Sequence, residues 1–401
     1  MGSRSARGFR AAPTLAVAFW LAALGGCRSV PTLPSERTMP ERVARLDALC
    51  AMPGRVARVP TTACGVTIAL EEKGRFDAGR RYVFLHGLLS DRRVWRFVAA
   101  DLGRDSDVVL VDLPGCGEST GPDPAIVGDA PYTPRALAAA VLDALRRDPT
   151  ARPGDTRPIT LVAHSFGGAV VLRMLAEEDL ARGYADVLRR VDSAVLLAPT
   201  DVGLERQPPE FVTVGTASAL EVSLAQATGI LRREVTSTVI ASSTGRGGAV
   251  SEEAERMTGA IVDPLKRRAA QAMMRGAVPW RADGRPDWPE IDRLDRLYAR
   301  VRPPCLVVWG RHDEVLSSST GHRIRDRLPR AWLRIVPEGT HTLPVEFASE
   351  CATLLRDFPR TMGAGWASVG DVPSTATLSV PTRVPPPCAP RSSARAGSAA
   401  R

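Results

Sequence analysis

Short apolar runs alternate along the chain with stretches of helical periodicity. Runs of about four to eight apolar and β-branched residues bounded by Gly, Pro or Asp are typical of buried strands, and amphipathic stretches between them are typical of crossover helices. The alternation predicts an α/β fold with a mostly parallel central sheet flanked by helices. The strands are expected at residues 82–85, 108–111, 159–163, 194–197, 306–309 and 330–336.

The helices between these runs carry recognisable signals. Thr133-Pro134 combines a capping hydroxyl with a proline in the first turn, so a helix is predicted from there to about Arg147. Apolar residues recur at helical spacing in three further segments, residues 92–102, 167–176 and 344–358.

A long insertion separates two of the predicted strands. About a hundred residues lie between Leu197 and Leu306, whereas a simple connection to a strand takes about two to six residues. We therefore expect a mostly helical cap at residues 202–287, inserted after the strand at residues 194–197, which we count as the sixth strand of the complete sheet. Its helices are expected near 217–235 and 251–274. Residues 41–201 and 288–360 would then form the two parts of the α/β core.

Composition places the chain among ordinary globular proteins. It has 401 residues, of which 44% are hydrophobic and 24% charged, close to the averages of soluble domains. The formal charge of +9 would attract polyanions if it were concentrated. The basic residues are almost all arginines, scattered along the chain, and only Lys73 and Lys266 are lysines. We expect no nucleic-acid partner.

The first residues indicate export. Arg4, Arg7 and Arg10 precede an apolar run at residues 11–24 that is too short to span a bilayer comfortably. Residues 1–26 are therefore interpreted as a signal peptide. Leu24-Gly25-Gly26-Cys27 resembles the lipobox of bacterial lipoproteins, which implies lipidation of Cys27, with palmitate among the acyl chains, and membrane contact through that lipid.

That resemblance also implies a location. The protein is expected to be exported and anchored to a membrane of the bacterial cell envelope, on the periplasmic side or at the outer membrane. A plain signal peptide with an incidental cysteine is the alternative. Residues 27–40, with three prolines, would be a tether, and residues 361–401, rich in Pro, Ser, Ala and Arg, a flexible tail.

The remaining cysteines suggest at most one disulfide. Cys50 and Cys64 are close in sequence and are a plausible pair in an oxidising compartment. Cys305 falls in a predicted strand and Cys351 in a predicted helix, where a buried free thiol is expected. No pair has the spacing of metal ligands, so no metal site is predicted.

One serine has the setting of a nucleophile. In Ala163-His164-Ser165-Phe166-Gly167-Gly168, Ser165 stands between a predicted strand and a predicted helix, with small residues two positions before and after it. Such a strained turn raises the hydroxyl above the sheet and directs the next backbone N–H toward the same space. Ala163 replaces the glycine that is usual at the first small position.

With this turn the chain resembles the α/β-hydrolase superfamily from about Val66 to Phe358. Four other segments agree: RYVFLHG, ending in His86-Gly87, VVLVDLPGCGEST at residues 108–120, CLVVWGRHDEVL at residues 305–316 and EGTHTLPVE at residues 338–346. The resemblance implies an oxyanion hole formed by the backbone N–H groups of Leu88 and Phe166. It also implies a catalytic triad of Ser165, Asp313 and His341, in the chain order expected of this fold.

The triad assignment has alternatives. A serine hydroxyl becomes a strong nucleophile only when an imidazole takes its proton, and His341, in the loop after the last strand, is the candidate base. Thr340 stands where the family usually has glycine. Of the other histidines, His164 should point away from Ser165, His86 should brace the oxyanion loop, and His312 and His322 should lie on the surface.

The acid is less certain by sequence. Asp313 follows the expected strand and would orient the imidazole of the base, with Glu314 and Asp201 as alternatives. Asp112 is interpreted as a carboxylate that structures its loop. Four tryptophans could line a pocket or belong to the core, and their sequence positions do not decide between these: Trp95, Trp280, Trp288 and Trp309.

We therefore expect a monomeric serine hydrolase that cleaves a small or medium carboxylic ester through an acyl-enzyme, without a metal or organic cofactor. A serine at this turn argues against relatives that use aspartate there, such as epoxide hydrolases. The same triad could serve haloperoxidase, C–C hydrolase or acyltransferase chemistry. The remaining alternative is a hydrolase-like lipoprotein that binds a partner and has no activity.

Overall fold

The computed structural model describes residues 54–63, 65–152, 154–202, 218–231, 233, 235–236, 248–279, 281 and 286–361. The expected signal peptide and tether lie outside these residues, as do residues 362–401 of the expected tail and Cys27, Cys50 and Cys64. Thr361, the first residue of the expected tail, is helical. Of the helices described, none is long and apolar enough to cross a bilayer.

The described residues contain an eight-stranded sheet with the strand order β1-β2-β4-β3-β5-β6-β7-β8. The pairs β1–β2 and β2–β4 are antiparallel, and all later pairs are parallel. The predicted mostly parallel sheet is confirmed, and the six expected strands correspond to β3 to β8. The strands are β1 Arg55–Pro60, β2 Thr67–Gly74, β3 Arg81–Leu85, β4 Asp107–Val111, β5 Ile159–His164, β6 Val191–Leu197, β7 Cys305–Gly310 and β8 Ala331–Val336.

The first two strands were not expected from the sequence. β1 is an edge strand with mostly exposed side chains, so it lacks an apolar run. β2 starts with buried Ile68 and Leu70 but ends in Glu71-Glu72-Lys73-Gly74. Glu72 is nevertheless 1% exposed, because its carboxylate forms ion pairs with Arg55 and Arg81. Pairing between distant residues thus allows a charged segment to form a strand.

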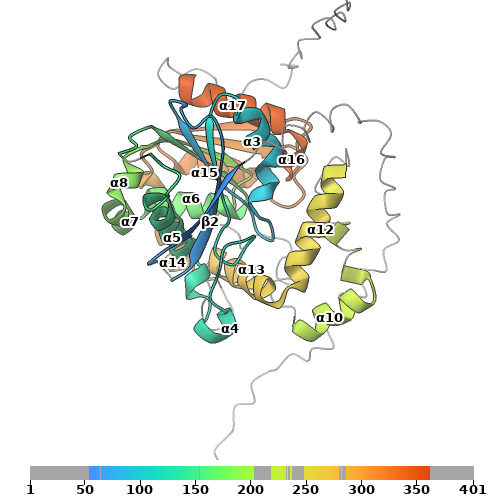
Figure 1. Ribbon diagram of the computed structural model, residues 1–401. Helices are drawn as coiled ribbons and strands as arrows, with labels where there is room; N and C mark the ends of the chain where they lie inside the picture. Colours follow the sequence, from blue (N-terminus) through green and yellow to red (C-terminus); the bar gives the residue numbers. More distant parts are fainter. Residues whose placement is uncertain are drawn as a thin grey trace, which may run out of the picture. The chain divides into compact units, whose positions relative to one another are not determined.

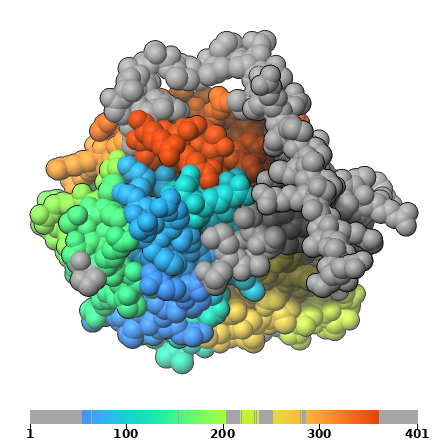
Figure 2. Space-filling model, turned by 45° about the horizontal axis from the view of Figure 1, so that its top comes forward, coloured from blue at the N-terminus to red at the C-terminus, as the bar shows by residue number. Residues whose placement is uncertain are grey.

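Helices cover both faces of the sheet (Figure 1). On one face α3 (Arg96–Leu102) packs against α17 (Ala348–Thr361), and the two lie side by side in Figure 2. On the other face α5 (Pro134–Arg146) packs against α6 (Phe166–Ala176). The remaining core elements are η2 Arg92–Trp95, α4 Pro124–Val127, η3 Ala130–Tyr132, α7 Glu178–Gly183, α8 Ala185–Leu188, α14 Trp288–Leu297, η5 Tyr298–Arg300, α15 Ser318–Arg327 and α16 Leu343–Glu346.

The expected start of α5 is confirmed: Thr133 is its N-cap, accepts a hydrogen bond from the Ala136 backbone N–H at 3.3 Å, and is followed by Pro134. The prediction of a single helix at residues 344–358 is wrong. The chain forms the short α16, breaks at Phe347, and continues as α17. Phe347 leaves helical geometry, with φ −120° and ψ 38°, so the two helices are separate. The side chain of Glu346, at the end of α16, binds the loop that carries His341.

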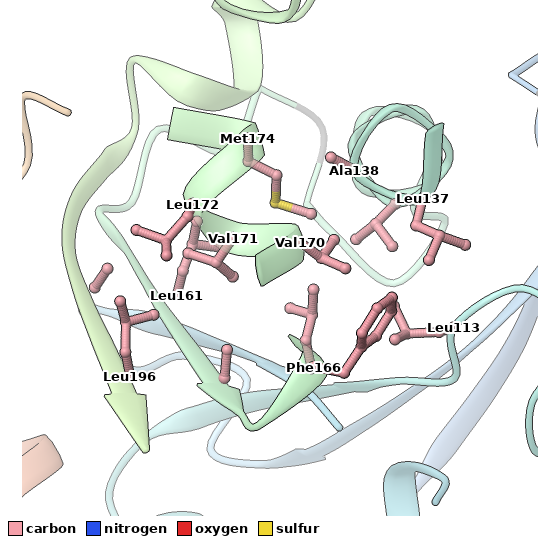
Figure 3. Packing of buried hydrophobic residues seen from close by; sticks show 14 of the residues in the cluster. Leu113, Leu137, Ala138, Leu161, Phe166, Val170, Val171, Leu172, Met174 and Leu196 are labelled. Atoms are coloured by element: carbon pink, nitrogen blue, oxygen red, sulfur yellow. The ribbon is translucent and has the colours of Figure 1, made fainter. Parts of the chain in front are cut away.

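The core around α6 supports the strand that precedes it. Figure 3 shows Val170 and Met174 of α6 facing Leu137 and Ala138 of α5, with Leu161 of β5 below them. These side chains are fully buried. Burying an aliphatic side chain of this size contributes about 1.5–3 kcal/mol, so β5 and α6 hold the turn between them in a rigid frame.

The inserted segment contains the helices α10 (Ala219–Ala227), α12 (Gly248–Val262) and α13 (Pro264–Ala277). The sequence suggested one helical segment at 251–274, but Asp263 ends α12 and caps α13, accepting from the backbone N–H groups of Leu265 and Lys266. Pro264 at the first helical position reinforces this break. Val222, Leu231 and Ile261 belong to a small separate apolar cluster here.

Ion pairs attach α13 to the core. Arg268 binds Asp123 at 2.6 Å and Arg275 binds Asp129 at 2.6 Å, in the segment after β4. These pairs are partly exposed, so each contributes at most about 1 kcal/mol. Their main effect is to orient the inserted helices over the carboxyl end of β4.

A buried charge cluster lies at the amino ends of the strands. Arg81 begins β3, Asp107 begins β4, and the two residues are register partners. The Asp107 carboxylate lies 3.4 Å from Arg81 Nε and 2.9 Å from Arg157 Nη1. Burial raises the pKa of Asp107 to about 6, although both arginines favour the ionised form.

Candidate active site

Ser165 occupies a strained turn at the carboxyl end of β5. Its backbone angles are φ 50° and ψ −121°, a conformation that costs about 1–3 kcal/mol for a non-glycine residue. The end of β6 holds this turn on both sides: Ser165 N–H donates to Leu197 O at 2.9 Å, and Thr200 N–H donates to Ser165 O at 2.9 Å. The side chain is partly exposed, so the hydroxyl remains accessible.

The glycines around this turn are required by close packing. A Cβ on Gly167 would lie 2.6 Å from His86 O, and a Cβ on Gly168 would lie 2.3 Å from Pro199 Cβ. A Cβ on Gly87 would lie 3.0 Å from Ser165 Cβ. The small residues of the sequence motif therefore allow the loop after β3 to approach the turn.

The two backbone amides expected to form an oxyanion hole lie in segments that border Ser165. Phe166 is the first residue of α6, where a backbone N–H has no acceptor within the helix. Leu88 follows Gly87 in the loop that touches Ser165. Its neighbour Leu89 has φ 56°, and Ala198 after β6 has φ 42°.

The strained backbone conformations lie close to the carboxyl ends of neighbouring strands. In the described part of the chain the non-glycine residues with positive φ are Leu89, Ser165 and Ala198. They follow β3, β5 and β6, which are neighbours in the sheet. Strained residues persist where surrounding structure over-determines them, and they cluster at functional sites.

Asp313 and His341 are brought together by the loops after β7 and β8. His341 Nδ1 lies 2.9 Å from Asp313 Oδ2. The other oxygen, Oδ1, accepts from the backbone N–H groups of Val315 and Leu316 at 2.9 and 2.8 Å. The Asp313 side chain has no exposed surface. With Oδ1 held by its own turn, the carboxylate presents Oδ2 to the imidazole in one fixed orientation.

The two loops meet through glycines. A Cβ on Gly310 would lie 2.4 Å from Thr340 O and 2.5 Å from Gly339 O. His312 N–H donates to Gly339 O at 2.8 Å. The absence of a side chain at Gly310 therefore allows the acid loop to contact the histidine loop.

A carboxylate that the sequence analysis did not assign holds the histidine loop. Glu346 Oε2 accepts from Thr340 Oγ1 at 2.8 Å and from Thr342 Oγ1 at 2.9 Å, so both neighbours of His341 are bound to one oxygen. Threonine at 340, where the family usually has glycine, is thus part of this anchor. The spacing Thr-His-Thr with a glutamate four residues later was the available signal.

His164 lies against the candidate base. His164 Nε2 is 2.8 Å from the backbone O of His341, so this nitrogen donates, and the two rings are 4.9 Å apart. Burial lowers the pKa of His164 to about 3, with His341 adding to the effect. A neutral ring agrees with a structural role for His164. Its contact with His341 was not foreseen from the sequence.

The other histidines lie where they were expected. His86 is buried, with Nδ1 2.7 Å from Gly87 O, and its Nε2 accepts from Leu113 N–H at 3.0 Å. It links the loops after β3 and β4, as a brace for the oxyanion loop should. His312 and His322 are exposed.

The alternative acids are engaged elsewhere or exposed. Asp201 is buried, and its carboxylate accepts from Tyr298 Oη at 2.6 Å and pairs with Arg323. Glu314 is exposed. Asp112 accepts from the backbone N–H groups of Arg92 and Glu118 at 2.7 and 2.9 Å, which fits its expected structural role.

The aromatic and thiol residues that were considered are mostly structural. Trp95 and Trp309 are fully buried in the core, whereas Trp288 is 50% exposed. Trp280 lies outside the described residues. Cys305 and Cys351 are buried free thiols, as expected. Within the described part of the chain, no group of three His, Cys, Asp or Glu residues is arranged to hold a metal ion.

Comparison with known proteins agrees with this fold. Residues 82–354 match the family described as alpha/beta hydrolase. The chain is 26% identical over 282 residues to the dihydrolipoyllysine-residue acetyltransferase component of an acetoin cleaving system from Pseudomonas putida, a match covering 68% of this chain and 62% of that protein. The chain spans only about half to three fifths of the length of the curated relatives that it matches.

Solved structures give the same fold. The esterase RhEst1 from Rhodococcus sp. ECU1013 is 20% identical with a TM-score of 0.57, over 78% of this chain and 100% of that chain. The epoxide hydrolase CorEH is 16% identical with a TM-score of 0.57, over 77% of this chain and 100% of that chain. At these identities the likeness concerns the fold alone. Because the family match covers most of the chain, the protein belongs to the alpha/beta hydrolase family.

Proposed function

We propose that this protein is a serine hydrolase that cleaves a small or medium carboxylic ester through an acyl-enzyme, with Ser165, His341 and Asp313 as its catalytic triad. The observation that carries the proposal is the hydrogen bond between His341 Nδ1 and Asp313 Oδ2 at 2.9 Å. The backbone of His341 also contacts His164, the residue before Ser165.

The chemistry follows from these positions. Because Nδ1 donates to Asp313, the Nε2 atom of His341 is the nitrogen free to accept a proton from Ser165 Oγ as that oxygen attacks the ester carbonyl. The backbone N–H groups of Leu88 and Phe166 would stabilise the developing oxyanion. His341 then donates the proton to the departing alcohol, and water, activated by the same imidazole, releases the acid.

The nucleophile limits the bond that is cleaved. Opening an epoxide through a covalent intermediate needs a carboxylate nucleophile, which forms an alkyl ester that water can hydrolyse. A serine would form an ether, which water does not cleave. Although an epoxide hydrolase shares the fold, Ser165 therefore favours acyl transfer.

A fluorophosphonate probe tests the proposal. Wild-type protein should be labelled, whereas Ser165→Ala should not be labelled and His341→Ala should react far more slowly. His322→Ala, which removes an exposed histidine, is the matched control and should be labelled normally. Hydrolysis of p-nitrophenyl esters of graded chain length should fall by about 10⁴-fold or more in both site variants.

Two other outcomes separate the alternative functions. Folded wild-type protein that resists the probe and hydrolyses no ester would favour a binding protein without activity. Formation of a new ester in the presence of an added alcohol, at the expense of hydrolysis, would favour an acyltransferase.

We further propose that Cys27 is lipidated and anchors the exported protein to a membrane of the cell envelope. The support is the sequence alone, since Arg4, Arg7 and Arg10 precede an apolar run that leads to Leu24-Gly25-Gly26-Cys27. Metabolic labelling with an alkynyl palmitate in a bacterial host should mark the wild type and leave Cys27→Ser unmarked. Equal labelling of both would exclude lipidation at this residue.

A further inference from the structure

A cavity of about 230 Å³ lies between the core and the inserted helices. Its walls come from Leu89 and Ser90 after β3, Cys116 after β4, and Arg256 and Lys266 on α12 and α13. Sites for whole small molecules are usually larger, about 300–1,000 Å³. This cavity therefore has room for one part of a ligand, and it starts one residue from Leu88, a candidate oxyanion donor.

The charges around the cavity leave one cation unbalanced. Arg93 is bound by Asp91 at 2.6 Å. Arg256 is bound by Glu252 at 2.7 Å and also by Glu253. The ammonium group of Lys266 has neither an ion pair nor a hydrogen bond among the residues that the structure describes, although the side chain is only partly exposed.

Among the described residues around the cavity, one cation therefore lacks an anionic partner. This favours a singly charged anion with acceptor oxygens as the ligand.

We propose that this cavity binds a carboxylate of the substrate, with Lys266 as its counter-charge. This rests on the proposed ester hydrolysis and names its substrate class: esters whose acyl chain ends in a carboxylate, such as half esters of dicarboxylic acids. A carboxylate carries one negative charge, which Lys266 balances, whereas a phosphate monoester would bring close to two.

Kinetics with matched esters test the assignment. We expect the full chain to prefer 4-nitrophenyl hydrogen glutarate to the neutral 4-nitrophenyl pentanoate in kcat/KM. Lys266→Met should reduce that preference about tenfold, through a higher KM for the glutarate ester, because a charge-assisted contact is lost. Lys266→Arg should retain most of the preference.

The other lysine supplies the control. Lys73 Nζ pairs with Glu71 at 3.0 Å and does not line the cavity, so Lys73→Met makes the same change of charge elsewhere and should keep the glutarate preference. An unchanged ratio of the two esters in Lys266→Met, with its thermal unfolding like that of the wild type, would overturn the assignment.

A binding measurement makes the test independent of turnover. Calorimetry should detect monomethyl glutarate binding to Ser165→Ala and about tenfold weaker binding to Ser165→Ala/Lys266→Met. If the wild type hydrolyses neither ester but this difference in binding is found, the proposed hydrolysis fails and the carboxylate site stands. If pentanoate is hydrolysed and monomethyl glutarate binds equally to both variants, only the carboxylate site fails.

Discussion

His164 Nε2 lies 2.8 Å from the backbone O of His341, and the two imidazole rings are 4.9 Å apart. The residue before the candidate nucleophile therefore fixes the candidate base. Because burial holds the pKa of His164 at about 3, its ring stays neutral and keeps the Nε2–H that donates to His341.

This contact predicts how His164 affects catalysis. His164→Ala should lower kcat for ester hydrolysis by about tenfold, since a slightly misplaced base transfers protons poorly, with KM little changed. In the wild-type profile of kcat/KM against pH, His164 should contribute no ionisation above about pH 5, because its buried ring is already neutral there. A fall in kcat/KM with the slope of two bound protons on the acid side of the profile would contradict a neutral His164.

The choice of triad acid is tested by two matched substitutions. Asp313→Asn should reduce kcat by about 10³–10⁴-fold with little loss of stability, because the orientation and charge that support the imidazole are lost. Asp201→Asn should instead leave kcat near the wild-type value and lower the free energy of unfolding by about 1–3 kcal/mol, since Arg323 loses a buried partner. Steady-state kinetics and urea unfolding of both variants would decide, and the reverse pattern would assign the acid to Asp201.

The close approach of the acid and histidine loops predicts a large effect of one methyl group. Gly310→Ala would place a Cβ 2.4 Å from Thr340 O, so the loops must separate and the bond between Asp313 and His341 must lengthen. We expect kcat to fall by about 10²-fold and thermal stability to decrease. In Gly183→Ala the new Cβ meets no atom within 4 Å, so this control should retain activity.

The buried cluster at the amino ends of β3 and β4 predicts a pH dependence of stability. Burial raises the pKa of Asp107 to about 6 from 3.8, so the folded protein binds more protons than the unfolded chain between these values. The stabilisation that comes from protonating Asp107 in the folded protein is therefore complete below about pH 4. It is lost as the pH rises through 6. Lowering the pH from 7 to 5 should stabilise the wild type by about 1 kcal/mol relative to Asp107→Asn.

Urea unfolding at the two pH values measures this difference. The side chain of Asp77 is 65% exposed, so Asp77→Asn should follow the wild type closely. A wild type and an Asp107→Asn variant with parallel pH dependence would show that Asp107 is ionised in the folded protein at pH 5.

The sequence by itself determined the fold class, six of the strands and the chain order of Ser165, Asp313 and His341. These follow from local properties, since apolar periodicity, Thr133-Pro134 and the small residues around Ser165 act within a few positions of the chain. The tertiary structure decided which groups meet. It paired His341 with Asp313 instead of Asp201 and bound Glu346 to the histidine loop. It also made a strand of the charged end of β2 and left Lys266 without an ion pair among the residues that the structure describes. Each of these results depends on the distance between groups, and most of these groups come from segments far apart in the sequence. Local sequence patterns do not set such distances, whereas hydrogen bonds and ion pairs act only over a few ångströms.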